Sequence, residues 1–92
     1  MATYVATLMH GKRDGEGTYT FEGEPTLIQK SAMGALRAFM SHIDDKLAPR
    51  HADWHVNAVM KNAEHSVVTA LGTLTFEKGG EQPFVCLIHQ DS

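Results

Sequence analysis

The feature that most constrains the fold is an excess of apolar strand surface over the helical surface available to cover it. One segment, 26–47, has the pattern of an amphipathic helix, whereas several strand-like segments carry apolar residues on both faces. In one of them, Val68 and Leu74 fall on one face, and Val67 and Leu71 fall on the other. An antiparallel sheet in a small monomer usually has one apolar and one solvated face. The second face is therefore predicted to need a partner.

The pattern of elements predicts an α+β fold in ββαβββ order, formed by one domain that spans residues 1–92. Strands are expected at 3–9, 18–22, 54–61, 66–76 and 83–89. The helix should begin at a capping box formed by Thr26 and Gln29 and end before Pro49. If the helix returns the chain to its starting end, the first and fifth strands run antiparallel and can pair. The predicted spatial order is 2-1-5-4-3, with a single long helix packed on one face of a five-stranded antiparallel sheet.

Strict alternation divides the strand residues between two faces. The helix is expected to cover Tyr4, Ala6, Leu8, Trp54, Val56, Ala58, Met60, Val68, Ala70, Gly72, Leu74, Phe76, Phe84, Cys86 and Ile88. The opposite face should hold the apolar residues Val5, Met9, Val59, Val67, Leu71, Val85 and Leu87. Polar residues are interspersed with them: Thr3, Thr7, His55, Asn57, Thr69, Thr73, Thr75 and His89. This mixed composition is typical of a protein–protein interface rather than of a domain core.

Left bare, such a patch would exceed the few hundred Å² that a monomer usually exposes. A C2 homodimer is the commonest way to bury one patch on both copies. We therefore expect a homodimer joined through Val5, Val67, Leu71, Val85 and Leu87. The alternative is that the sheet curls, or that the first hairpin folds over, so that the chain covers its own surface.

Two histidines suggest a different use of the same face. If Phe76 lies opposite Phe84 and the turn at 62–64 has three residues, His55 and His89 flank Leu71, roughly 10 Å apart. That separation would suit a small-molecule ligand or a general acid and base. It would equally suit two histidines at the rim of an interface. The ligand-binding set under this alternative is His55, His89, Asn57, Thr69 and Thr73.

Composition and motifs disfavour several other functions. The net charge is −3 and no basic cluster is present, so no nucleic-acid partner is expected. No apolar run reaches the roughly 20 residues needed to span a bilayer, and no signal peptide is recognisable, so a cytoplasmic protein without a membrane partner is expected. His51 and His55 are four residues apart, but Pro49 and the extended segment that follows argue against the helix this spacing requires. No metal site and no cofactor are predicted.

The single cysteine, Cys86, excludes an intrachain disulfide and is expected to be a small buried hydrophobe. No catalytic residues are assigned. The function expected is that of a small, non-catalytic, self-associating interaction or regulatory module. The alternative is a small-ligand-binding protein or small enzyme that uses the second sheet face.

Overall fold

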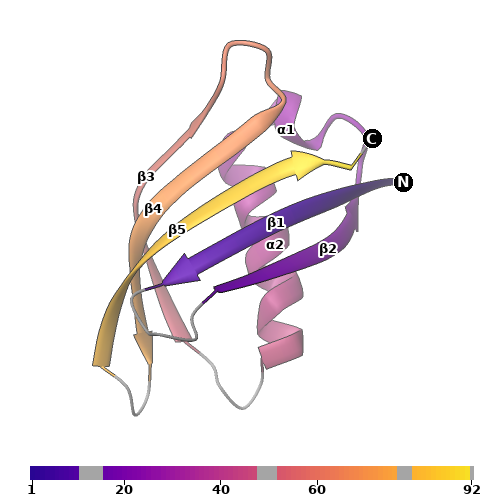
Figure 1. Cartoon of the computed structure of the whole chain (residues 1–92). Coiled ribbons are helices and arrows are strands. Elements are labelled where there is room, and N and C mark those ends of the chain that lie inside the picture. The colour runs from indigo at the N-terminus through magenta and orange to yellow at the C-terminus, as the bar shows by residue number, and fades with distance from the viewer. Residues whose placement is uncertain (11–15, 48–51, 77–79, 92) are drawn as a thin grey trace.

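The computed structural model describes residues 1–10, 16–47, 52–76 and 80–91. Five strands form one antiparallel sheet, and helix α2 lies against one of its faces (Figure 1). The elements are β1 (Ala2–His10), β2 (Glu16–Gly23), α1 (Leu27–Lys30), α2 (Ala32–Leu47), β3 (Ala52–Lys61), β4 (Val67–Phe76) and β5 (Gly80–Gln90). The strand order is β2-β1-β5-β4-β3, and every neighbouring pair is antiparallel. The predicted α+β fold and spatial order are confirmed.

The predicted single long helix is wrong, because the helical segment is broken at Ser31. Ser31 has extended backbone angles (φ −167°, ψ 124°), so the segment divides into α1 and the longer α2. The Ser31 hydroxyl accepts a hydrogen bond from the backbone N–H of Gly34 at 2.9 Å. Serine in this position satisfies one of the unpaired N–H groups at a helix start. The cap therefore lies at Ser31, whereas Thr26 makes no side-chain cap bond.

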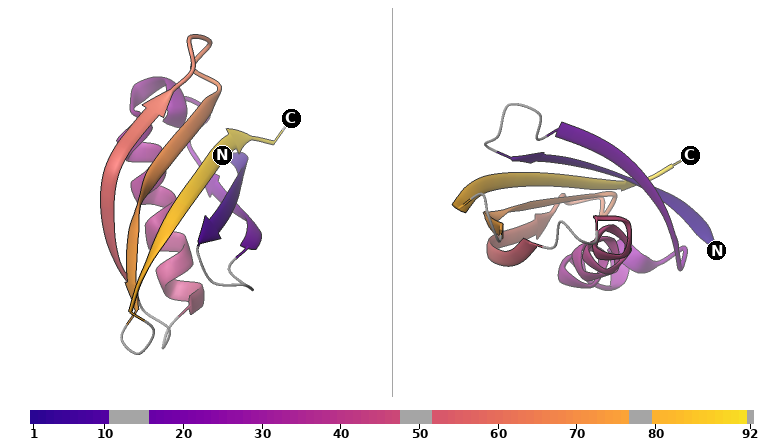
Figure 2. Two further views of the ribbon diagram at one scale, coloured as in Figure 1. Left: turned by 60° about the vertical axis from the view of Figure 1, so that its left-hand side comes forward. Right: turned by 90° about the horizontal axis from the view of Figure 1, so that it is seen from below.

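The core lies between α2 and the face of the sheet that it covers (Figure 2). Its fully buried side chains come from both layers: Tyr4, Leu36, Phe39, Ile43, Val68, Cys86 and Ile88. Aromatic rings cross from helix to sheet, with the Phe39 centroid 5.7 Å from that of Tyr19 and 6.3 Å from that of Trp54. Burying large side chains of this kind is the main favourable term in folding. The expectation that Cys86 is a buried hydrophobe is confirmed.

A β-bulge in β3 changes which residues reach the core. The register between β3 and β4 shifts between Val56 and Ala58, so Asn57 is an additional residue in β3. An additional residue reverses the alternation beyond it. The predictions for Ala58, Val59 and Met60 are therefore wrong. Val59 packs against the core, whereas Met60 is 55% exposed on the opposite face.

The fifth strand begins at Gly80, earlier than predicted, and Pro83 lies inside it. Proline has no N–H, so strands accept it where no ladder bond is needed. The ladder between β1 and β5 ends at the pair His10–Phe84. Pro83 lies just beyond that end, where it interrupts no described pairing with β1.

Candidate interaction surface: the open face of the sheet

The side of the sheet that faces away from α2 is the candidate functional surface, and we call it the open face. In Figure 1 the sheet lies in front of α2, so the open face is turned toward the reader. Strand alternation and register assign it these central residues: Val5, Thr7, Met9, Ala58, Met60, Val67, Thr69, Leu71, Thr73, Val85, Leu87 and His89. None of these side chains is fully buried in the isolated chain.

Large apolar side chains are exposed on this face. Met9 is 38% exposed, Leu71 41% and Leu87 37%, and Met60 joins them through the bulge. Apart from Met1, these four are the exposed large hydrophobic residues within the described ranges. Isolated exposed apolar residues are ordinary on a protein surface, whereas a contiguous group marks an interaction site.

Pairing across the sheet makes the group contiguous. Val85 of β5 lies between Met9 of β1 and Leu71 of β4. One step along β5 on the same face, Leu87 lies between two threonines, with Met60 beyond the second of them. Directly paired residues on one face have Cβ atoms about 4.5–5.5 Å apart, which is contact distance for these side chains. The apolar patch therefore crosses β1, β5, β4 and β3.

The residues predicted to form the dimer interface all belong to this patch or to its border. Val5 and Val67 lie on either side of His89, and Leu71, Val85 and Leu87 form the centre. Sequence reasoning missed Met60 as a member of the patch. The bulge that redirects it has no clear signal in the sequence, because Asn57 fits an unbroken strand equally well.

The structure does not bring the two predicted ligand-binding histidines together. His55 pairs with Thr73, whereas His89 pairs with Val67, and these two positions on β4 are about 20 Å apart along the strand. The expectation that both flank Leu71 is wrong. His55 and Thr73 are neighbours, and the other members of the predicted set are separate, with Thr69 beside Leu87 and Asn57 in the bulge.

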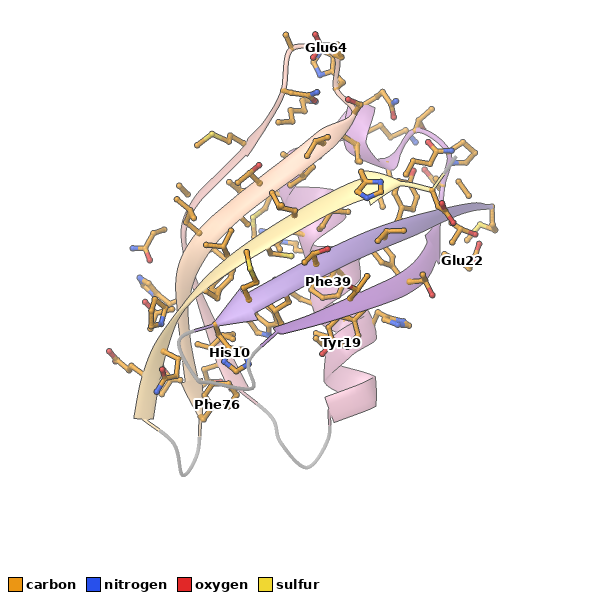
Figure 3. All side chains as sticks on the ribbon, in the orientation of Figure 1. His10, Tyr19, Glu22, Phe39, Glu64 and Phe76 are labelled. Carbon is orange, nitrogen blue, oxygen red and sulfur yellow. The ribbon has the colours of Figure 1, made fainter. Side chains whose placement is uncertain are left out.

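Both turns differ from those on which that expectation depended. Phe76 pairs with Gly80 and not with Phe84, which shifts the register between β4 and β5. At the other turn, the Asn62 backbone N–H donates to the carbonyl oxygen of Val67 at 3.2 Å, so the loop is longer than three residues. The Asn62 side-chain oxygen accepts from the N–H groups of Ser66 and Val67, which holds the wider turn. Its tip, at Glu64, projects beyond the sheet (Figure 3).

Groups suited to metal or thiol chemistry are not assembled on the open face. Within residues 1–10, 16–47, 52–76 and 80–91, no three His, Cys, Asp or Glu side chains are grouped closely enough to hold a metal ion. Burial raises the pKa of the Cys86 thiol to about 12, and this side chain lies on the covered side of the sheet. A thiol in that environment is a poor nucleophile. Neither helix in the described part of the chain has the length and apolar character needed to cross a bilayer.

The open face is therefore an apolar surface with threonines and two histidines, His55 and His89, among its apolar residues, and its geometry suits contact with another surface. The ligand-binding alternative stays a prediction. Comparison with protein-family models, with curated proteins and with solved structures found no match to this chain.

Proposed function

We propose that the protein is a non-catalytic, self-associating interaction or regulatory module whose open face packs against the open face of a second copy. The observation that supports this most directly is the contiguous exposure of Met9, Met60, Leu71 and Leu87 on one side of the sheet. Two copies related by a two-fold axis cover the same patch on each other, which removes all four side chains from water. The cytoplasmic location expected from the sequence is part of this proposal.

The size of the open face supports a stable dimer. Its strands are eight to eleven residues long. With about 3.3 Å per residue and about 4.8 Å between strands, five such strands present roughly 600–850 Å² in projection. Stable interfaces bury about 600–1,000 Å² on each partner. Two sheets packed face to face, about 10 Å apart, would therefore form an interface of ordinary size.

The composition of the face fits the same arrangement. Its centre is apolar, and its polar members are mainly threonines, whose methyl groups pack while their hydroxyls bond to water or to the partner. Interfaces between separately folded chains have this character, with an apolar centre and a polar rim. The proposed dimer places Leu71, Val85 and Leu87 at that centre.

The test is the substitution Leu87→Asp, with Ser41→Asp, at an exposed position of α2, as the matched control. A carboxylate buried in an apolar interface without a partner costs several kcal/mol, so the face contact should weaken by at least about 100-fold. Light scattering after size exclusion should show a smaller species for Leu87→Asp alone. In that species a soluble paramagnetic probe should reach the methyl groups of Leu71 and Met60. Equal mass and equal methyl exposure in the wild type and Leu87→Asp would contradict the proposal.

A further inference from the structure

We infer that the free edge of β2 is a second contact surface, which pairs antiparallel with β2 of another copy and joins two sheets into one. This goes beyond the face-to-face dimer, because it uses backbone groups at the edge of the sheet. β2 is the terminal strand of the order β2-β1-β5-β4-β3. It lies at the opposite edge from β3 in Figure 1.

The hydrogen-bond pattern identifies which backbone groups of β2 point outward. Asp91 donates its N–H to the carbonyl oxygen of Thr3 at 2.8 Å, so the backbone groups of Thr3 point toward β5. In an antiparallel sheet successive residues point their N–H and C=O to opposite sides. Tyr4 therefore points toward β2 and forms a hydrogen-bonded pair with Phe21. By the same alternation, the backbone groups of Thr18, Thr20 and Glu22 point away from the sheet.

The two edges of the sheet differ in how they are protected. Natural proteins protect edge strands with bulges, prolines and charged side chains, particularly lysine. The β3 edge has a bulge between Val56 and Ala58 and carries Lys61 near its end. β2 pairs with β1 in unbroken register from Glu16 to Gly23, and its sequence contains no lysine, arginine or proline. Among the residues that the structure describes, no further strand pairs with this edge of β2.

The sequence of β2 is complementary to itself in one register. In an antiparallel contact between two β2 strands, the residues whose backbone groups point outward must lie opposite each other. A two-fold axis that passes between the strands at Thr20 or at Tyr19 meets this condition. An axis at Tyr19 places Gly17 opposite Phe21 of the partner subunit, so Phe21 gains no aromatic partner across the contact. An axis at Thr20 places Thr18 opposite Glu22 of the partner subunit and Tyr19 opposite Phe21 of the partner subunit. The Glu22 carboxylate already accepts a hydrogen bond from a threonine within the chain, because the Thr3 hydroxyl donates to Glu22 Oε1 at 2.8 Å.

The same register brings aromatic residues together on the covered side. Tyr19 lies opposite Phe21 of the partner subunit, and cross-strand aromatic pairs stabilise sheets. Within one chain, Tyr19 of β2 already lies beside Phe39 of α2 (Figure 3). The edge contact would extend this aromatic cluster from one copy to the other. The hydroxyl and aromatic positions match when the partner is a second copy of β2.

The test uses Thr20→Pro, with Thr20→Val as the matched control, in the Leu87→Asp background. Proline at 20 removes an N–H that points away from β1, so the ladder between β1 and β2 keeps its hydrogen bonds. We expect the Leu87→Asp chain to associate through β2 at micromolar to millimolar concentrations. Adding Thr20→Val should preserve that association, and adding Thr20→Pro should yield a monomer.

Amide exchange in the wild-type chain gives a readout that needs no substitution. When the protein concentration is raised, the N–H groups of Thr18, Thr20 and Glu22 should become at least roughly tenfold more protected from exchange. The reason is that a hydrogen-bonded amide exchanges only when its hydrogen bond opens. If amide exchange at these three positions stays unchanged in the associated protein, the inference is overturned. The copies would then associate through the open face or another surface, and not through the edge of β2. A monomeric Leu87→Asp chain at all concentrations would also overturn it while leaving the face-to-face proposal intact. Conversely, protected edge amides together with an unaltered mass for Leu87→Asp would contradict the face-to-face proposal alone.

Discussion

Replacing Gly72 by alanine should strongly destabilise the protein, because β3 crosses this position too closely for a side chain. Gly72 pairs with Val56 at the bulge. A Cβ atom at residue 72 would lie 2.0 Å from the carbonyl oxygen of His55 and 2.6 Å from Cε2 of Phe84. Carbon atoms make favourable non-bonded contacts only beyond about 3.5 Å, so the β3 backbone would have to move by more than about 1 Å.

The expected cost follows from comparable overpacking. An additional methyl group in a packed region costs about 1–3 kcal/mol, and the upper end applies here because one neighbour is backbone held in the β3–β4 ladder. For a small domain with a urea m-value of about 1 kcal/mol per M, a loss of about 3 kcal/mol lowers the unfolding midpoint by about 3 M. Urea unfolding followed by the fluorescence of Trp54, which contacts Phe84 in the core, would measure it.

Gly80→Ala is the matched control for this experiment. A Cβ at residue 80 would meet nothing within 4 Å, but Gly80 has a φ of +71°. Alanine in this left-handed conformation costs about 1–2 kcal/mol. The steric account of Gly72 would be refuted if Gly72→Ala lowered the midpoint no further than Gly80→Ala does.

Two further predictions concern single side chains. Lys61 donates from Nζ to the carbonyl oxygens of Ile28 (3.2 Å) and Gln29 (2.9 Å) at the end of α1. Lys61→Met should therefore lower the free energy of unfolding in urea by about 1–2 kcal/mol and speed amide exchange at Ser31. Equal stability of the variant and the wild type would show that water replaces these two hydrogen bonds. Burial raises the pKa of Cys86 from 9.0 to about 12, so the unfolded state loses its proton first and the free energy of unfolding should fall as pH rises above about 9. Cys86→Ala should show less of this decline, and an identical pH profile would contradict it.

The strand order and most of the face assignment could be predicted from the sequence. Chain direction alone favours pairing of the first and fifth strands, and β1, β4 and β5 keep an unbroken alternation. Val5, Leu71 and Leu87 therefore lie on the open face as expected, while Tyr4, Val68 and Ile88 lie in the core. In these strands successive residues point to opposite faces without interruption, so alternation alone is sufficient to assign each residue to the open or the covered face.

The errors in the strands arose where backbone geometry depends on contacts between distant segments. The bulge at Asn57 adds one residue to β3 opposite Gly72, and the two features fit each other only once β3 and β4 are paired. The register between β4 and β5 depends on where the turn begins, and Pro83 suggested a strand start that lies later than the real one. The prediction that His55 and His89 lie on either side of Leu71 depended on that register. The helix break at Ser31 depends on a local hydrogen bond that competes with a continuous helix.

Sedimentation equilibrium of the wild-type chain across micromolar concentrations tests the central claim most directly. The exposed patch around Leu71 and Leu87 predicts a mass of at least two chains, with dissociation on dilution. A mass of one chain at every concentration would contradict the account, because the open face would then be stable in water without a second copy.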